Sequence, residues 1–239
     1  MSENRKFSVL MSVYVKENPA FLEEAVESIL HQTLKPSEVV IVEDGPLTPE
    51  LYQVLEKLEA QSSIPIKRCP LEQNRGLGLA LQYGVLQCQY DVIARMDTDD
   101  IAVEDRFEQQ FELMEKENLD LLGGHIAEFI DQPDEIVSYR RVPTKHEDII
   151  VYQRMRSAFN HMTVMFKKEM VLKAGNYEDG LYMEDDLLWL NMISAGARTG
   201  NVDQILCKVR VGAGMFERRG GLRYLKLYRQ ARQRMHARG

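Results

Sequence analysis

The first 117 residues alternate between short apolar runs and segments with the periodicity of amphipathic helices. The eight segments, strand and helix in turn, are residues 7–14, 19–30, 38–43, 49–58, 64–69, 76–85, 90–96 and 103–117. Strands that are apolar along nearly their whole length are buried on both faces, as in parallel sheets covered by helices. The alternation therefore predicts an α/β fold built on a mostly parallel sheet.

After residue 118 the pattern becomes mixed. Strands are expected at residues 119–129, 135–141 and 163–166, and helices at residues 146–156, 168–174 and 185–195. No Gly/Ser-rich linker or tandem repeat interrupts the chain, and its 239 residues are enough to bury a sizeable core. We therefore predict one domain over residues 1–204, with halves at 1–117 and 118–204, followed by a separate segment at 205–239.

Charge divides the chain at the same place. Residues 205–239 hold ten Lys or Arg and one acid, a net +9, and since the whole chain carries −7, residues 1–204 carry −16. An acidic body is a poor surface for nucleic acid, so we expect no nucleic-acid partner. Residues 222–238 are amphipathic, which fits either a helix packed on the body or a helix lying on an anionic membrane.

The cysteines and the N-terminus indicate the compartment. Cys69, Cys88 and Cys207 form no metal-binding or disulfide spacing, so buried thiols in a reducing compartment are expected. The first apolar run is broken by Lys16 and Glu17, is too short for a membrane span and lacks the cleavage pattern of a signal peptide. We therefore expect a cytoplasmic protein.

An acidic turn follows the last apolar strand of the first half. Asp97, Asp99 and Asp100 come directly after residues 90–96, and ligands of open parallel sheets bind beyond the carboxyl ends of the strands. Three neighbouring carboxylates repel one another unless a cation lies between them, and oxygen ligands suit Mg²⁺ or Mn²⁺. The alternative is a solvated turn that caps the helix starting near residue 103.

A second acid and a glycine loop also lie at expected strand ends. Asp44 follows residues 38–43 and is placed to hydrogen-bond a base or ribose, or else belongs to an Asp-Gly-Pro turn. Arg75 lies in the Asn-Arg-Gly-Leu-Gly segment at 74–78. This segment is a helix start that can approach a phosphate, although it matches neither common phosphate-binding glycine motif.

A second acidic cluster opens a helix in the later half. Glu184, Asp185 and Asp186 precede an apolar segment that contains Trp189, the sole tryptophan. Acids there either complement the helix dipole or supply a partly desolvated general base that takes a proton from an alcohol. His161, between an expected helix and strand, is either a structural histidine or a ligand.

The ordered set of motifs resembles the family 2 glycosyltransferases with the GT-A fold. The matching segments are SVYVKENPAFLEEAVESILHQT, VVIVEDGP, NRGLGLAL, ARMDTDD, NHMTVMF, GNY and YMEDDLLW, and RVGAGMFERRGG resembles bacterial transferases that build exopolysaccharide, capsule or O-antigen units. The resemblance covers nearly the whole chain. It implies a nucleotide-diphosphate-sugar donor, a divalent metal and inversion at the anomeric carbon.

The resemblance also assigns roles to individual residues. It implies that the nucleotide is bound by Ser12, Tyr14, Glu17, Asp44, Arg75 and Asp97. It implies a metal held by Asp99 and Asp97, a catalytic base at Asp185, and a Glu184 that orients the acceptor. A loop near the acceptor or diphosphate is assigned to His161, Arg218 and Arg219. Glu43, Pro46 and Gln82 depart from the commoner family residues, so base specificity does not transfer.

The implied reaction moves a sugar, most simply from a UDP-sugar, to a hydroxyl of a saccharide acceptor, lipid-linked at the inner membrane face. Residues 1–117 then bind the donor and residues 118–204 the acceptor. The processive Gln-x-x-Arg-Trp motif is absent, which indicates one sugar per encounter. The alternatives are a sugar-1-phosphate nucleotidyltransferase, for which no glycine loop follows the first strand, and a non-catalytic nucleotide-sugar-binding module.

Overall fold

The computed structural model describes residues 5–179, 183–212, 229 and 233. Arg218, Arg219 and most of the amphipathic segment at 222–238 lie outside the described residues. In the part that is described, no helix is long and apolar enough to cross a membrane.

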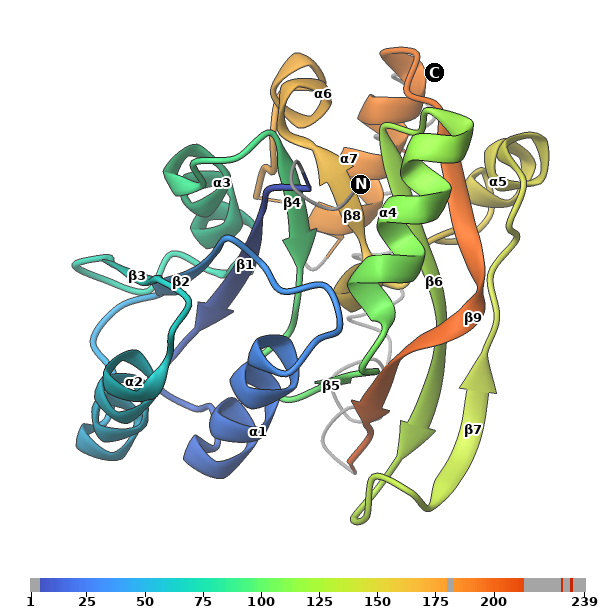
Figure 1. Ribbon diagram of the computed structural model, residues 1–239. Coiled ribbons are helices and arrows are strands. Elements are labelled where there is room, and N and C mark those ends of the chain that lie inside the picture. The colour runs from blue at the N-terminus through green and yellow to red at the C-terminus, as the bar shows by residue number, and fades with distance from the viewer. Residues whose placement is uncertain (1–4, 180–182, 213–228, 230–232, 234–239) are drawn as a thin grey trace.

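Strands and helices alternate through the first half as the sequence predicts (Figure 1). The elements of this half are β1 (Phe7–Val13), α1 (Pro19–Leu30), β2 (Glu38–Glu43), α2 (Pro49–Gln61), β3 (Ile66–Pro70), α3 (Leu77–Gln87), β4 (Val92–Arg95), β5 (Ile101–Ala102) and α4 (Arg106–Glu117). The second half contains β6 (Leu121–Phe129), β7 (Ile136–Arg140), α5 (His146–Gln153), the 3₁₀ turn η1 (His161–Thr163), β8 (Met165–Lys167), α6 (Lys168–Lys173), α7 (Glu184–Ser194) and β9 (Thr199–Arg210).

Two helix starts show why the sequence signals were informative. The Asn18 side chain accepts a hydrogen bond from Ala20 N (2.9 Å), and Pro19 occupies the first helical position of α1. Thr48 Oγ1 accepts from Leu51 N (3.3 Å) at the start of α2. Side-chain caps satisfy backbone N–H groups that have no partner inside the helix, and Pro lacks the N–H that would need one.

One nine-stranded sheet runs through both halves in the order β3-β2-β1-β4-β8-β6-β9-β5, with β7 paired to β6. The pairs β1–β2, β2–β3 and β1–β4 are parallel, whereas β8 is antiparallel to both β4 and β6. The sheet is therefore parallel in the first half and mixed in the second, which confirms the predicted fold class.

Helices cover both faces of the sheet. One core cluster takes its helical residues from α1, α2 and α4, and the other from α3, α5, α6 and α7. Figure 1 shows α4 crossing in front of β6 and β9. Trp189 of α7 is fully buried in the second cluster. The three cysteines are free and buried, which agrees with the prediction of thiols rather than disulfides.

Sequence reasoning missed the longest strand. β9 runs from Thr199 to Arg210, so the boundary proposed at residue 204 falls inside a strand of the sheet. The strand carries polar residues at its centre, including Asp203 and Gln204, and lacks the continuous apolar run used to find the others. The two-residue β5 was also missed, and because it occupies residues 101–102, α4 begins at Arg106 rather than near residue 103.

Candidate active site

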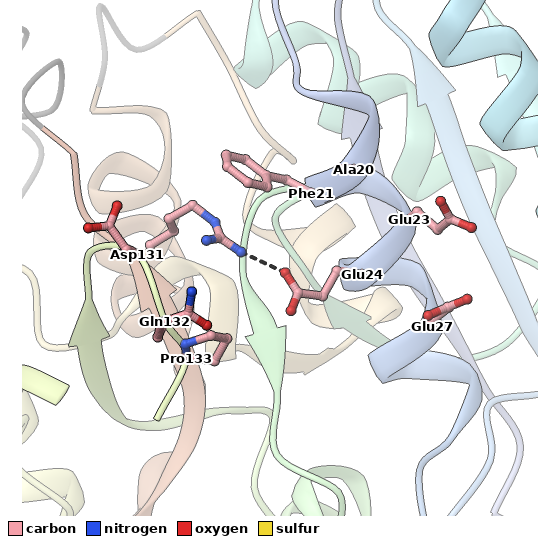
Figure 2. Close-up of a pocket in the computed structure, with 9 residues that line it drawn as sticks. Ala20, Phe21, Glu23, Glu24, Glu27, Asp131, Gln132 and Pro133 are labelled. Carbon is pink, nitrogen blue, oxygen red and sulfur yellow. Dashed lines mark hydrogen bonds and ion pairs between the residues drawn. The ribbon is translucent and has the colours of Figure 1, made fainter. Parts of the chain in front are cut away.

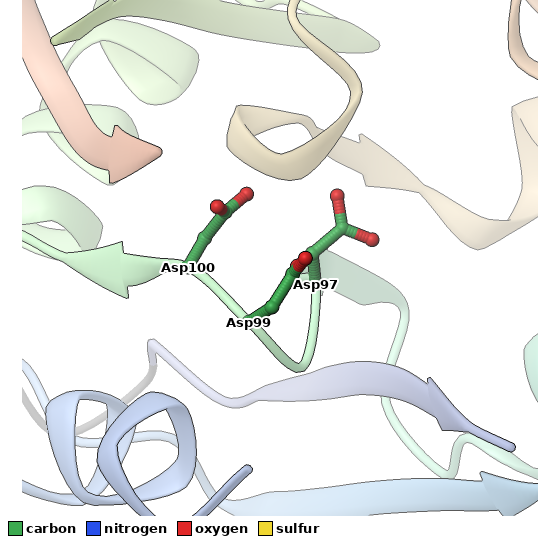
Figure 3. A group of neighbouring side chains, drawn as sticks. All are labelled: Asp97, Asp99 and Asp100. Carbon is green, nitrogen blue, oxygen red and sulfur yellow. The ribbon is translucent and has the colours of Figure 1, made fainter. Parts of the chain in front are cut away.

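The acidic turn between β4 and β5 gathers its three carboxylates in one place (Figure 3). One oxygen each from Asp97, Asp99 and Asp100 lies within 4.8 Å of the other two. Asp97 and Asp99 are half-buried, and Asp100 is buried. The three acids that are neighbours in the sequence thus bring their carboxylate oxygens close together in the structure.

Charge within this turn is only partly balanced. Asp100 Oδ1 accepts a hydrogen bond from the backbone N–H of Arg210 (3.0 Å). Burial raises the pKa of Asp100 well above its usual value, and the charges of Asp99 and Asp97 raise it further. The negative charges of the three carboxylates repel one another, and a small divalent cation that binds between them removes this repulsion. Ligands that are all oxygen atoms suit Mg²⁺ or Mn²⁺.

A buried arginine stands behind the acidic turn. Arg95, the last residue of β4, forms an ion pair with Asp97 and is 1% exposed. Its backbone oxygen accepts a hydrogen bond from Arg106 Nη2 (2.7 Å), and Arg106 is itself fully buried. Neither arginine was singled out from the sequence, because Arg95 ends an apolar strand and Arg106 lies among acidic residues at a helix start, where an exposed arginine is expected.

The second acidic cluster occupies the first turn of α7. Asp186 is buried and accepts a hydrogen bond from Gln153 Nε2 (2.9 Å), so this acid joins α7 to α5. Burial raises the pKa of Asp185 to about 8, with further contributions from the charges of Asp186 and Glu184. Burial also raises the pKa of Glu184. Asp185 therefore has the basicity needed to accept a proton near neutral pH.

His161 lies in a ring cluster close to this helix. Its Nε2 is 3.0 Å from Tyr177 Oη, and its ring packs edge-on against Trp189 with centroids 5.8 Å apart. Burial, and then the charge of Arg95, lowers the pKa of His161 well below its usual value, so the ring is neutral. Its contacts are those of a packed histidine, and its proposed acceptor role remains a prediction.

Asp44 holds the glycine loop. Its Oδ1 accepts from Arg75 N (2.7 Å) and its Oδ2 from Gly76 N (3.0 Å), so the carboxylate ties the end of β2 to the start of α3. Gly45 has φ +85°, and a Cβ there would lie 2.6 Å from Asn74 N. The Arg75 side chain is exposed beside this turn. The sequence located these residues but not the hydrogen bonds between them.

The parallel register brings the predicted donor residues to one edge. Ser12 lies opposite Val42 in the pairing of β1 with β2, and Leu10 lies opposite Arg95 in the pairing of β1 with β4. Ser12, Asp44 and Asp97 therefore lie at or just beyond the carboxyl ends of three adjacent strands. Tyr14 and Glu17 follow β1 and are half-buried.

The start of α7 reaches this edge through α3. A Cβ on Gly78 would lie 3.0 Å from Glu184 Cβ, which shows how closely the two helix starts pack. The charge of Arg95, which pairs with Asp97, also lowers the pKa of Asp185 against the effect of burial. The two acidic clusters, far apart in the sequence, thus belong to one region of the molecule.

Figure 2 shows an open pocket beside this region, between α1 and the turn after β6. It is lined by Ala20, Phe21, Glu23, Glu24, Glu27, Asp131, Gln132, Pro133 and Arg210. The guanidinium of Arg210 pairs with Glu24 (2.6 Å) and stacks on Phe21, 3.8 Å from the ring centroid. Because the same residue donates its backbone N–H to Asp100, the pocket wall and the acidic turn are connected.

Comparison with known proteins gives consistent matches to one family. The family model of Glycosyl transferase family 2 matches residues 8–173. An uncharacterized glycosyltransferase of Haemophilus influenzae is 47% identical over 222 residues, covering 92% of this chain and 82% of that protein. The amylovoran biosynthesis glycosyltransferase AmsE of Erwinia amylovora is 42% identical, with the same coverage. A UDP-Gal:alpha-D-GlcNAc-diphosphoundecaprenol beta-1,3-galactosyltransferase of Escherichia coli is 38% identical, covering 92% of this chain and 79% of that protein.

Solved structures share the fold at low sequence identity. S. aureus TarS 1-349 in complex with UDP-GlcNAc superimposes with a TM-score of 0.70 at 18% identity, over 95% of this chain and 65% of that one. The mannosyltransferase PcManGT from Pyrobaculum calidifontis, in complex with GDP-Man and Mn²⁺, gives 0.66 at 15% identity, over 87% and 57%. These likenesses confirm the predicted GT-A fold. Together with the matches in sequence, they lead to one conclusion: the chain belongs to glycosyl transferase family 2.

Proposed function

We propose that this protein transfers a sugar from a UDP-sugar to a hydroxyl of a lipid-linked saccharide, with inversion, during synthesis of a bacterial surface polysaccharide. The observation that carries the proposal is the presence of two different acidic groups in one region. One is a compact set of carboxylate oxygens, and the other contains an aspartate with a pKa raised to about 8. The names of the E. amylovora and E. coli relatives support the donor, the acceptor and the pathway.

Asp97 and Asp99 are the residues we assign to a divalent metal, Mn²⁺ or Mg²⁺. Both are half-buried at the end of β4, and the adjacent Asp100 is fixed by its hydrogen bond from Arg210. A metal bound there neutralises the diphosphate and stabilises the charge that develops on the leaving group. The protein contributes ligands whose backbone is fixed by the sheet.

The nucleotide is assigned to the edge formed by β1, β2 and the start of α3. Ser12, Tyr14 and Glu17 follow or end β1, and Tyr14 offers an aromatic ring for stacking on the base. Asp44 acts by holding the backbone of the loop that carries Arg75, since both its oxygens accept hydrogen bonds from that loop. The exposed Arg75 guanidinium is free to approach a phosphate.

Asp185 is assigned as the general base. It takes the proton of the acceptor hydroxyl, whose oxygen forms a bond to the anomeric carbon as the bond from that carbon to the diphosphate breaks. Attack from the face opposite the leaving group inverts the configuration in a single displacement. Glu184, in the same helical turn, orients the acceptor.

Membrane contact is assigned to the basic segment at 213–239, since residues 205–210 belong to β9, where Lys208 and Arg210 pair with Asp134 and Glu24. The segment holds eight Lys or Arg and one acid, a net +7, and each basic residue near an anionic surface contributes about 1 kcal/mol of attraction. This places the enzyme at the cytoplasmic face, where a lipid-linked acceptor is presented, and gives Arg218 and Arg219 access to the acceptor or diphosphate. Liposome binding should fall when residues 213–239 are removed, and equal binding with and without them would exclude this assignment.

A transfer assay tests the function as a whole. The enzyme is incubated with Mn²⁺, a lipid-diphosphate-linked GlcNAc, and UDP-Gal or UDP-GlcNAc in turn. NMR then gives the anomeric configuration of the product. We expect one UDP-sugar to yield a product of inverted configuration, and Asp185→Asn to yield none at equal protein concentration. Release of a nucleoside triphosphate from a sugar nucleotide and pyrophosphate would instead indicate a nucleotidyltransferase, and UDP-sugar binding without turnover would indicate a binding module.

A further inference from the structure

Arg95 is a buried cation whose hydrogen-bonding capacity is only partly used. Arg95 is 1% exposed, and its Nη2 forms an ion pair with Asp97. Within the part of the chain that is described, Nε and Nη1 have no hydrogen-bond partner. A buried guanidinium with two unpartnered nitrogens is costly, because each N–H has lost water without gaining an acceptor.

The backbone of Arg95 is fixed on every side. Its N–H donates to Val164 O (2.9 Å), and its carbonyl oxygen accepts from Arg106 Nη2 (2.7 Å). Arg106 in turn donates to Gln110 Oε1 and contacts the sulfur atoms of Met96 and Cys207, none of which is a carboxylate. Two buried guanidinium groups, those of Arg95 and Arg106, therefore lie close to the acidic turn. Among the described residues, only Arg95 forms an ion pair with an acid of this turn.

The charge of Arg95 acts on both acidic clusters. Burial raises the pKa values of Asp100, Glu184 and Asp185, and in all three cases the positive charge of Arg95 acts in the opposite direction. The same charge reaches His161, which lies beside α7. In a low-dielectric interior such an interaction is stronger than between exposed groups. The ion pair with Asp97 is the direct contact through which the Arg95 side chain reaches the acidic turn.

We propose that Arg95 is a positioning residue that fixes the metal-binding turn, by pairing from the buried end of β4 with Asp97. This inference rests on the proposed function, because that function gives Asp97 its role as a metal ligand. Arg95 acts through Asp97, whose carboxylate it holds in one place beyond the end of β4.

A purely structural arginine would behave differently. Its loss would lower the melting temperature, but folded molecules would keep their kcat. A positioning residue changes kcat in folded molecules, because a displacement of about 1 Å in a catalytic group can lower a rate by about 100-fold. The ion pair with Asp97 further predicts partial rescue by lysine, which keeps the positive charge but not the planar guanidinium.

The experiment compares Arg95→Met, Arg95→Lys and the matched control Lys167→Met. Lys167, the last residue of β8, lies opposite Val92 at the far end of β4 and pairs with Asp120 just before β6 (2.8 Å). The control therefore removes a cation–aspartate pair from the same sheet. For each variant we measure the melting temperature without metal, the Kd for UDP as Mn²⁺ is varied, and the kcat and KM of transfer.

We expect Arg95→Met to lower kcat by about 100-fold, with a smaller change in donor KM and a several-fold shift in the Mn²⁺ concentration needed for UDP binding. Arg95→Lys should recover part of kcat, and Lys167→Met should keep kcat within about twofold of wild type. The inference is overturned if folded Arg95→Met or Arg95→Lys retains wild-type kcat and Mn²⁺ dependence. If Arg95→Met does not fold, Arg95→Lys decides alone. If the wild type neither binds UDP with Mn²⁺ nor transfers sugar, the proposed function fails and the inference falls with it.

Discussion

The two halves of the chain each contribute three acids to the candidate site, but they position them in different ways. Asp97, Asp99 and Asp100 follow β4, which is hydrogen-bonded to β1 on one side and to β8 on the other. Asp185 and its neighbours begin α7, which is not part of the sheet and instead packs against α3, α5 and α6. The half that we propose binds the donor therefore obtains its geometry from strand register, and the half that we propose binds the acceptor obtains it from side-chain contacts between helices.

The largest expected effect is the loss of the base in the acceptor half. Asp185→Asn keeps the size of the side chain but cannot accept the acceptor's proton, so kcat should fall by about 10²–10⁴-fold. The Kd for UDP should stay unchanged, because the donor half is intact. Steady-state kinetics and calorimetry on the same preparation check both. A variant that loses UDP binding to the same extent would show that the two halves are not separate in function.

The pH dependence of the reaction tests the environment of the same residue. Because the pKa of Asp185 is raised to about 8 and only the ionised form is a base, kcat/KM should rise about tenfold per pH unit below 8 and level off above it. Asp186→Asn removes the neighbouring charge but keeps an oxygen for Gln153, so its profile should shift to lower pH. If the pH profile of Asp186→Asn does not shift, a group other than Asp185 determines the rise of kcat/KM with pH.

Gln32 in the first half and Gln153 in the second are both buried, so replacing each of them compares the two halves directly. Gln153 donates to Asp186 Oδ1 and accepts from Ala158 N, while Gln32 donates to Val103 O and accepts from Phe107 N. Replacing either by Ala should cost about 1–3 kcal/mol of unfolding free energy, measured by urea denaturation, because buried polar groups lose their partners. Only Gln153→Ala should also lower kcat, since only it anchors α7. Equal kcat in the two variants would contradict the contrast.

Two glycines with positive φ provide the smallest and most local test. Gly45 has φ +85° and would place a Cβ 2.6 Å from Asn74 N, whereas Gly196 has φ +91° with nothing within 4 Å. Gly196→Ala should therefore show the backbone strain alone, about 1–2 kcal/mol. Gly45→Ala should cost more and should also weaken UDP binding, because it displaces the loop held by Asp44. Thermal unfolding and UDP titration separate the two effects.

Much of the donor half could be predicted from the sequence, because its signals are local. Continuous apolar runs mark buried strands, and Asn18 and Thr48 mark helix starts, so the alternation of strands and helices and the strand-end acids could be predicted. The acids at the start of α7 were also found, as an acidic run before an apolar helix. Their partners were not, since the Gln153–Asp186 hydrogen bond joins residues 33 positions apart without any local pattern.

Other features escaped sequence reasoning for the same physical reason. β9 carries polar side chains at its centre, where Asp203 and Gln204 are exposed, so it lacks the continuous apolar run that marks the parallel strands. Arg95 sits in an otherwise apolar strand, and only the fold shows that its guanidinium is buried beside Asp97. Asp44 was placed at a strand end, but its hydrogen bonds to Arg75 and Gly76 depend on a turn 30 residues later.

The central claim is that the acidic turn after β4 binds a divalent metal together with a nucleoside diphosphate. Calorimetric titration of UDP, GDP and dTDP, each with Mn²⁺ and with EDTA, tests it most directly on wild type, Asp99→Ala and the control Asp105→Ala, which removes an exposed acid nearby. We predict micromolar, Mn²⁺-dependent binding of UDP to wild type and Asp105→Ala, and none to Asp99→Ala. Binding of UDP that is equal in EDTA and in Mn²⁺, or unchanged in Asp99→Ala, would contradict the account.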